Sequence, residues 1–216
     1  MAVIHHTTLR PTKLELLTEW LPTREWYAGT EPRPAKAGGF RLDDPAGEVG
    51  IEFMAVTDAD GAAYLVPMTY RAGPLAGAEH ALIGTCEHGV LGKRWIYDGA
   101  HDPVLVDRLY ALLAGRTQAQ AQSQTDTPDL TVTVSPAGRG TEGEAELVGA
   151  EDDREGTDVR VRASGTRLTL RLHRTLTPGP ASTPAPDAAT RLTAEWLLPD
   201  GTTARGTYVV VLGEDG

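Results

Sequence analysis

The sequence predicts an α+β fold: a small antiparallel sheet with packed helices, followed by a mainly antiparallel β domain. Three observations predict this class. Capped segments with an apolar face at residues 12–21 and 102–115 indicate two helices in the first half. Apolar and polar residues alternate with period two at several places, which is typical of half-buried strands. From residue 130 onward, only strand patterns occur.

The first predicted helix begins at a capping box. Thr12 and Glu15 form the pattern in which a hydroxyl accepts from first-turn amides while a glutamate reaches back to the cap. Leu14, Leu17 and Leu21 recur at helical spacing and share a face. Because a helix this short is not stable alone in water, it must pack against other elements.

A hairpin is predicted next. Residues 49–55 and 64–70 carry the alternation of two strands. Asp60-Gly61 between them favours the positive φ angles of a type I′ turn. Pro67 has no N–H to donate, which indicates an edge strand or a bulge.

The second predicted helix has signals at both ends. Asp102 is a favourable N-cap, Pro103 fits the first helical position, and Gly115 closes the helix. Its apolar face is formed by Leu105, Val106, Leu109, Leu112 and Leu113.

Composition divides the chain into two predicted domains. Residues 117–127 are polar and low in complexity, as expected of an exposed linker. We therefore predict domains at residues 1–116 and 128–216, with proline-rich connections at 31–39 and 178–187. Further strand patterns or short apolar runs occur at residues 3–9, 82–85, 95–97, 130–134, 143–149, 159–161, 167–172, 192–198 and 207–212.

Net charge, cysteine content and the lengths of the apolar runs limit the partners and the location that the sequence predicts. The net charge of -10 disfavours binding to nucleic acid and to anionic membranes. The single cysteine, Cys86, cannot form an internal disulfide, and no apolar run reaches the length of a signal-peptide core or membrane span. These features predict a cytoplasmic protein.

The motif WLPTREWYAG at residues 20–29 resembles the opening of the N-terminal cap domain of actinobacterial maltokinases. Residues 79–84 and 95–98, followed by Asp102-Pro103, are similar to stretches that recur in such caps. The resemblance covers nearly all of the first half. It implies a curved antiparallel sheet with helices packed on it.

The second half is similar, more weakly, to a kinase N-lobe. Residues 170–179, LRLHRTLTPG, resemble the strand that bears the ATP-anchoring lysine, but Arg171 stands at the lysine position. Arginine is a planar fork and does not replace a compact ammonium on phosphates. Residues 151–155 place four carboxylates where the family has a polar loop. These four are Glu151, Asp152, Asp153 and Glu155.

The resemblance therefore implies a degenerate N-lobe. The sequence contains no HGD-type catalytic loop and no DFE-type metal motif, which phosphoryl transfer in this family requires. We predict no catalytic residue, no cofactor and no kinase activity. The acidic residues 151–155 are expected to pair with Arg171 and Arg174 across the sheet, as a structural contact.

Some residues invite a ligand-binding interpretation. Arg94 and a group of aromatic side chains form the predicted ligand-binding set, as a platform for sugar rings; the alternative is that the aromatics build the core. The aromatic members are Trp20, Trp26, Tyr27, Trp95 and Tyr97.

Histidine and cysteine side chains do not predict a reactive site. His80, His88 and His101 lie close together in sequence, but no pair has a recognised metal-ligand spacing, so no metal site is predicted. Cys86 is not predicted to be a nucleophile, because the adjacent Glu87 raises the pKa of a thiol.

Three functions follow as hypotheses. The leading one is a non-catalytic accessory or regulatory protein related to the maltokinase cap. It would act in α-glucan, maltose or trehalose metabolism through a protein partner, either a kinase or a glucan-metabolising enzyme. The alternative is a module that binds a glycan or sugar phosphate. An enzyme, whether kinase or 1,4-α-glucan branching enzyme, is not expected, since branching requires a (β/α)₈ barrel with paired carboxylates.

Overall fold

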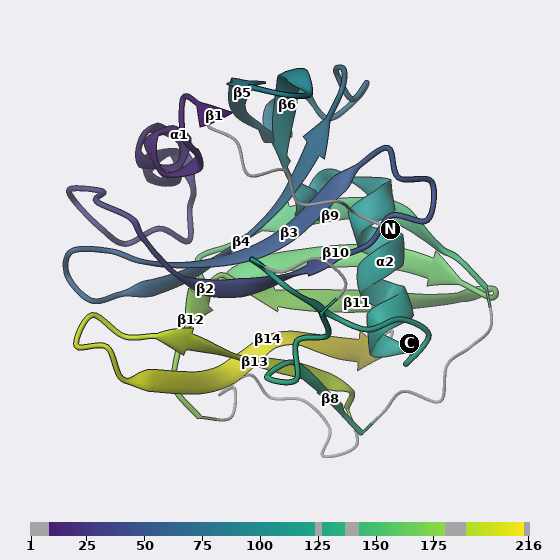
Figure 1. Ribbon diagram of the computed structural model, residues 1–216. Coiled ribbons are helices and arrows are strands. Elements are labelled where there is room, and N and C mark those ends of the chain that lie inside the picture. The colour runs from purple at the N-terminus through teal and green to yellow at the C-terminus, as the bar shows by residue number, and fades with distance from the viewer. Residues whose placement is uncertain (1–8, 124–126, 137–142, 180–188, 214–216) are drawn as a thin grey trace.

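Strands dominate the part of the chain that the computed structural model describes, which is residues 9–123, 127–136, 143–179 and 189–213 (Figure 1). The helices are α1 (Lys13–Trp20), η1 (Leu21–Thr23), η2 (Glu79–Ala81), η3 (Gly99–His101) and α2 (Pro103–Leu113). The strands are β1 (Leu9–Arg10), β2 (Ala35–Leu42), β3 (Gly50–Thr57), β4 (Ala63–Arg71), β5 (Leu82–His88), β6 (Gly92–Asp98), β7 (Gln120–Ala121), β8 (Thr133–Ser135), β9 (Ala145–Asp152), β10 (Gly156–Ala163), β11 (Thr166–His173), β12 (Thr175–Leu176), β13 (Arg191–Leu197) and β14 (Thr203–Gly213).

The predicted α+β class is wrong. The strands of the described residues form one 14-stranded sheet, whose main path is β1-β5-β6-β4-β3-β2-β13-β14-β11-β10-β9 and runs through both halves of the chain. Three short strands lie off this path: β12 pairs with β4, β7 with β2 and β8 with β13. Two short helices, α1 and α2, are the only α-helices among the described residues. The class was wrong because the two helices have clear signals at their caps, whereas β2 overlaps residues 31–39, which were predicted as a connection. The fold is therefore mainly antiparallel β.

Both predicted helix starts are confirmed. The Thr12 hydroxyl accepts from the amide of Glu15, and the Glu15 carboxylate accepts from the amide of Thr12 at 2.7 Å. Asp102 accepts from the amide of Val104 at 3.0 Å and caps α2. Gly115, with φ +72°, follows the end of α2 as predicted. These contacts join residues two to three positions apart, so the sequence alone contains them.

Strands β3 and β4 separate two hydrophobic cores. Met54 in β3 and Tyr64 in β4 face a smaller core that α1 completes with its buried face. Phe53 and Leu65 point the other way, into a larger core that contains the buried residues of α2. Because both faces of β3 and β4 are covered, their burial is nearly continuous along the chain.

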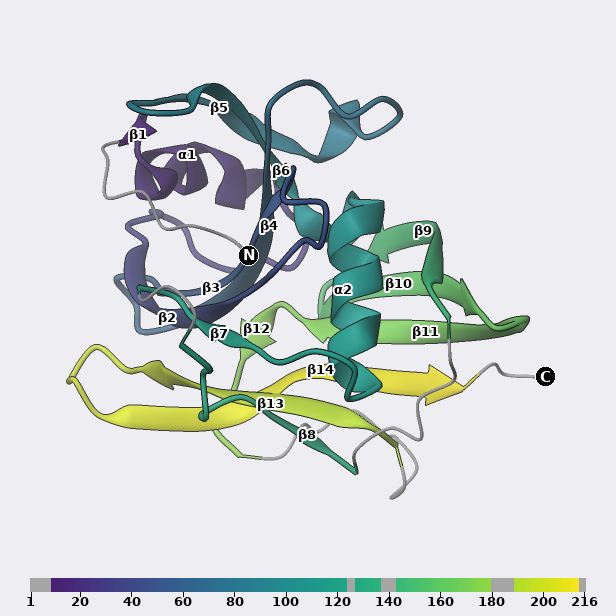
Figure 2. The same ribbon diagram turned by 45° about the vertical axis from the view of Figure 1, so that its right-hand side comes forward.

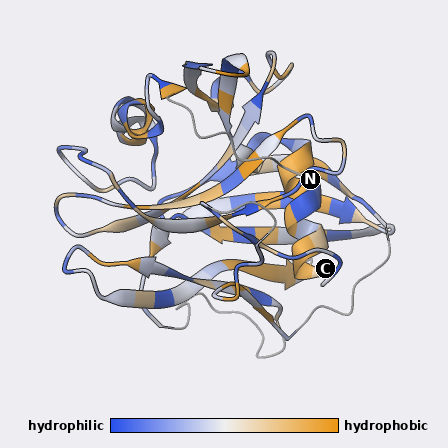
Figure 3. Cartoon of the chain, in the orientation of Figure 1, coloured by the Kyte–Doolittle hydropathy of each residue, from blue (hydrophilic) through white to orange (hydrophobic). Residues whose placement is uncertain are grey.

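Helix α2 runs across β9, β10 and β11 on the inner side of the curved sheet (Figure 2). Apolar residues concentrate on α2 and on the strands around it (Figure 3). Of the helices in the described part of the chain, none has the length and apolar character needed to cross a membrane.

Two details of the first hairpin differ from the prediction. Gly61 has φ +88°, but Asp60 does not have positive φ, so the turn is not type I′. Pro67 does not mark an edge strand, because β4 lies between β3 and β6 in the sheet. It falls between Leu65, whose amide donates to Arg174, and Met68, where pairing with β6 begins. No partner strand needs the missing N–H at that position.

The two halves of the sheet join at a pair of glycines in β2. Gly38, with φ +149°, pairs with Trp196 of β13. Gly39 has φ +124°, and a side chain there would overlap the carbonyl oxygen of Phe53. Only glycine permits this backbone path and this close approach. Glycines at 38 and 39 therefore serve the junction and do not mark a loop.

The strands predicted in the second half are confirmed in type, with ends that differ by a few residues. The division into domains at residues 1–116 and 128–216 stays a prediction. The predicted linker contains β7, which pairs with β2, and residues 124–126 lie outside the described residues. The predicted strand at residues 3–9 and the proline-rich connection at 178–187 lie largely outside the described residues as well.

Candidate functional site

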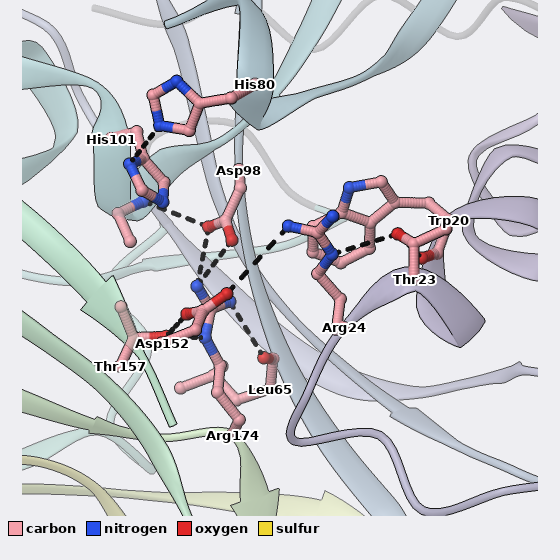
Figure 4. Close-up of polar contacts among 11 residues, drawn as sticks. Trp20, Thr23, Arg24, Leu65, His80, Asp98, His101, Asp152, Thr157 and Arg174 are labelled. Carbon is pink, nitrogen blue, oxygen red and sulfur yellow. Dashed lines mark hydrogen bonds and ion pairs between the residues drawn. The ribbon is translucent and has the colours of Figure 1, made fainter. Parts of the chain in front are cut away.

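A buried ion pair links the second half of the chain to the first (Figure 4). Arg174 lies between β11 and β12, Asp98 ends β6, and both side chains are excluded from solvent. The Nη2 atom of Arg174 donates to both carboxylate oxygens of Asp98, at 2.6 and 2.8 Å. Burying two charges is costly and is offset only when every polar group has a partner. The pair thus requires the surrounding groups to complete its hydrogen bonding.

Neighbouring residues supply those partners. Arg174 Nε donates to the Thr157 hydroxyl at 2.7 Å, and that hydroxyl donates to Asp152 at 2.5 Å. The guanidinium carbon of Arg174 lies 5.0 Å from the centre of the Trp26 ring, within cation–π range. With its donors occupied and no exposed face, Arg174 is a structural tie between residues from the two halves. The predicted pairing of Arg174 with the acidic residues 151–155 is wrong, because Arg174 pairs with Asp98 and is connected to Asp152 only through the Thr157 hydroxyl.

The three histidines do not converge. His80 and His101 lie 3.1 Å apart through their ring nitrogens, beside Asp98 (Figure 4). Burial lowers the pKa of His101, which favours a neutral ring that can accept or donate in this contact. His88 lies at the end of β5 and accepts from the amides of the following turn. Among the described residues, no group of three or more potential ligands is arranged to hold a metal ion.

Cys86 is buried in the smaller core. Burial, with a smaller contribution from Glu87, raises the pKa of its thiol. Since the ordinary pKa of a thiol is already above 7, Cys86 is protonated at neutral pH.

The predicted aromatic residues divide between two neighbourhoods. The ring centres of Trp20 and Trp26 lie 5.7 Å apart, and those of Tyr27 and Tyr64 lie 5.2 Å apart. Trp20 and Trp26 are only 6% and 2% exposed and belong to the smaller core. Arg24 covers the Trp20 ring, with its guanidinium carbon 5.0 Å from the ring centre (Figure 4).

The other two aromatic residues lie in β6. Tyr97 is buried, and its hydroxyl accepts from the amide of Leu75 at 2.9 Å. Trp95 is half-buried, and the Lys93 ammonium lies 5.0 Å from its ring centre. A role of these aromatic side chains in binding a sugar stays a prediction.

Arg171 is held by the acidic residues that were predicted to face it. Its guanidinium forms two parallel hydrogen bonds with Asp153, both 2.7 Å long. Asp158 lies 3.0 Å away on the neighbouring strand β10, and Glu155 lies 3.8 Å away. The predicted pairing is confirmed for Arg171. Its charge is compensated inside the fold.

Removal of this contact should have a signature in the pH dependence of stability. Hydrogen bonding to Arg171 lowers the pKa of Asp153 to about 2, from an ordinary value near 3.8. A depressed folded-state pKa stabilises the fold fully above the unfolded value, and this stabilisation is lost as pH falls through the folded value. We expect Asp153→Asn to lower Tm at pH 7, with a difference that shrinks below about pH 4.

Thermal unfolding of both proteins between pH 2 and 7 measures this difference. Glu151→Gln is a suitable control, because Glu151 lies in the same acidic run but contacts exposed Arg160 instead. A Tm difference for Asp153→Asn that does not change with pH would contradict the assignment.

A pocket of about 950 Å³ opens elsewhere, between the start of α1, the loop after β2, the end of β4 and the turn after β5. Glu52 in β3 lies at its base and is only 4% exposed. Its carboxylate accepts from Lys13 at 2.7 and 2.9 Å, from the Tyr70 hydroxyl at 2.5 Å and from the Gln122 amide at 2.6 Å. Arg94 is the one residue of the predicted ligand-binding set that lines the pocket.

Sequence reasoning missed the other pocket residues. One signal was present in the sequence: Glu52 alternates along β3 with Met54 and Val56, so its side chain points to the same side of the sheet as theirs, towards the smaller core. A carboxylate at such a position must find partners. Burial opposes its ionisation, but Lys13 and the hydrogen bonds outweigh burial and lower the pKa of Glu52.

Residues 20–102 match the family model of the maltokinase N-terminal cap domain. This segment is similar to that cap domain, and we call it the cap-like domain. It begins at the last residue of α1 and ends at the N-cap of α2, inside the predicted range 1–116. No curated protein matches the chain in sequence.

The cap-like domain contains Asp98 and Glu52, whereas Arg174 and Arg171 lie outside the matched segment. The resemblance of residues 170–179 to a nucleotide-binding strand stays a prediction.

Proposed function

We propose that the protein is a non-catalytic accessory or regulatory protein of maltose, trehalose or α-glucan metabolism, which acts by binding a protein partner. The observation that carries the non-catalytic part is the state of Arg171. A group that anchors nucleotide phosphates must keep N–H donors free to point at them. Arg171 instead forms a bidentate pair with Asp153 and lies 3.0 Å from Asp158.

The surrounding charges support the same conclusion. The turn between β9 and β10 contributes Asp153 and Glu155 beside Arg171, and their carboxylates would repel phosphate oxygens. Releasing Arg171 for a nucleotide would leave these carboxylates without their cation. The cap-like domain supplies the link to maltokinases, and a maltokinase or a glucan-metabolising enzyme of the same source is therefore the proposed partner.

The test of the non-catalytic role is a titration with ATP and magnesium, together with an assay for phosphorylation of maltose. We expect no ATP-dependent rise in Tm and no phosphorylated sugar. Arg171→Lys, which restores the residue type of the kinase pattern, is expected to remain inactive because Asp153 and Asp158 also hold a lysine. Maltose-dependent consumption of ATP by the unmodified protein would contradict the proposal.

The partner is tested separately, with purified maltokinase and purified glucan-metabolising enzymes of the same source. Size-exclusion chromatography of equimolar mixtures should show a complex with one of them. If none of these enzymes binds at micromolar concentration, the partner assignment fails while the non-catalytic role stands. The alternative function, a sugar-binding module, is favoured by the polar pocket around Glu52.

A further inference from the structure

We propose that the pocket around Glu52 binds a neutral, polyhydroxylated ligand such as a mono- or disaccharide. The inference concerns a site that the family match does not define, and it does not depend on the accessory role. The pocket volume of about 950 Å³ falls within the range of about 300–1,000 Å³ that is typical of small-molecule sites.

The base of the pocket is organised before any ligand arrives. Glu52 receives hydrogen bonds from an ammonium, a phenol and an amide, contributed by Lys13, Tyr70 and Gln122. These groups come from α1, β4 and the segment after β7, so they are fixed by separate elements of the fold. Because these polar groups are already held at defined positions, a ligand can bind to them without the entropy cost of ordering flexible side chains.

Both donors and acceptors remain for a ligand. An ammonium has three N–H donors, and Lys13 directs two contacts to Glu52 while its side chain is 31% exposed. The Gln122 side chain, whose amide nitrogen donates to Glu52, also carries a carbonyl oxygen that can accept a hydrogen bond. A hydroxyl group can both accept and donate, which suits such a mixed set better than a ligand that only accepts or only donates.

The charge of the pocket favours a neutral ligand. Its lining includes four cations, Lys13, Arg41, Arg71 and Arg94, and three carboxylates, Asp44, Glu48 and Glu52. Arg71 is compensated by a bidentate pair with buried Asp102, with both contacts at 2.6 Å. Asp44 accepts from three backbone amides, and Glu52 accepts from three side-chain donors, so both carboxylates are satisfied within the fold. A lining whose charges are largely paired in this way suits a neutral sugar better than an ion.

Apolar side chains complete the fit. Leu9, which is half-buried, and Leu91, which is 44% exposed, also line the pocket. The C–H faces of a sugar ring can pack on such side chains while its hydroxyls reach the network at the base. The mixture of apolar and polar lining is therefore consistent with a carbohydrate.

The experiment is isothermal titration calorimetry of the full chain with maltose, trehalose and glucose, and with maltose 1-phosphate and ATP–magnesium as charged probes. We expect at least one neutral sugar to bind with a millimolar or lower Kd. Gln122→Ala should weaken that binding about five- to tenfold, as expected for loss of one good hydrogen bond. Tyr70→Phe should have a similar effect.

Gln118→Ala is the matched control, since Gln118 is an exposed glutamine of the same segment that does not line the pocket. It should bind the sugar like the unmodified protein. Thermal unfolding of each variant separates the two roles of the network. Gln122→Ala that lowers Tm but leaves Kd unchanged would show a network that is only structural and would overturn the proposal. Absence of binding by all three neutral sugars, or tighter binding of a charged probe, would overturn it as well.

Discussion

Replacing Arg174 with methionine is expected to lower the free energy of unfolding by about 3–5 kcal/mol, because it leaves a buried carboxylate without its cation. Methionine fills much of the same space, so the effect reports the charge more than a cavity. Asp98 would retain only the amide of Ala100 among its present partners, at 3.2 Å. Urea unfolding at pH 7 measures the loss.

Two comparisons test this account of Arg174. The double variant Arg174→Met with Asp98→Asn should recover part of the loss, since no uncompensated charge remains inside the protein. Arg160→Met removes an exposed arginine that pairs with Glu151, and its effect should be far smaller. Equal losses for Arg174→Met and Arg160→Met would show that the buried pair has no special role.

Substituting alanine for Gly39 should cost about 3 kcal/mol or more, because two penalties act together. A Cβ atom would overlap the carbonyl oxygen of Phe53 and approach the Cα of Met54 within 3.0 Å. The φ angle of +124° is also one that side chains with a Cβ rarely adopt. The loss would fall at the junction of the two halves of the sheet, next to the pairing of Gly38 with Trp196.

Gly47→Ala is the matched control for this substitution. Gly47 has φ +69°, but nothing lies within 4 Å of a Cβ placed there. Its cost should therefore reflect backbone strain alone, at about 1 kcal/mol. If urea unfolding gives the same cost at both positions, the close contact of β2 with β3 at Gly39 is not a constraint on the fold.

The predicted and observed folds diverge for an identifiable reason. Glycine and proline between residues 31 and 39 are the usual signs of a connection, so no strand was predicted there. In the structure, Gly38 and Gly39 both lie inside β2 with positive φ angles, and at Gly39 strand β3 lies too close for a side chain. This arrangement depends on the pairing of β2 with the next strand, β3, and with β13, which is distant in sequence.

The candidate sites show the same division. Arg171 and the acidic residues near it could be related from sequence, since β10 and β11 are consecutive strands and place Asp158 opposite Arg171. Arg174 and Asp98 are 76 residues apart, and no pattern in the sequence pairs them. Glu52 and Gln122 are separated by 70 residues, so their contact at the base of the pocket could not be predicted from the sequence either.

The sequence by itself determined the local structure: the capping box at Thr12, the start of α2 at Asp102 and the strands of the second half. It also carried the motif at residues 20–29, which lies in the maltokinase cap-like domain. These features depend on residues only a few positions apart, so the chain encodes them without its fold. The continuous sheet, the Arg174–Asp98 pair and the Glu52 pocket were decided by tertiary structure alone. Each requires segments far apart in the chain to meet, and only the packing of the two cores brings them together.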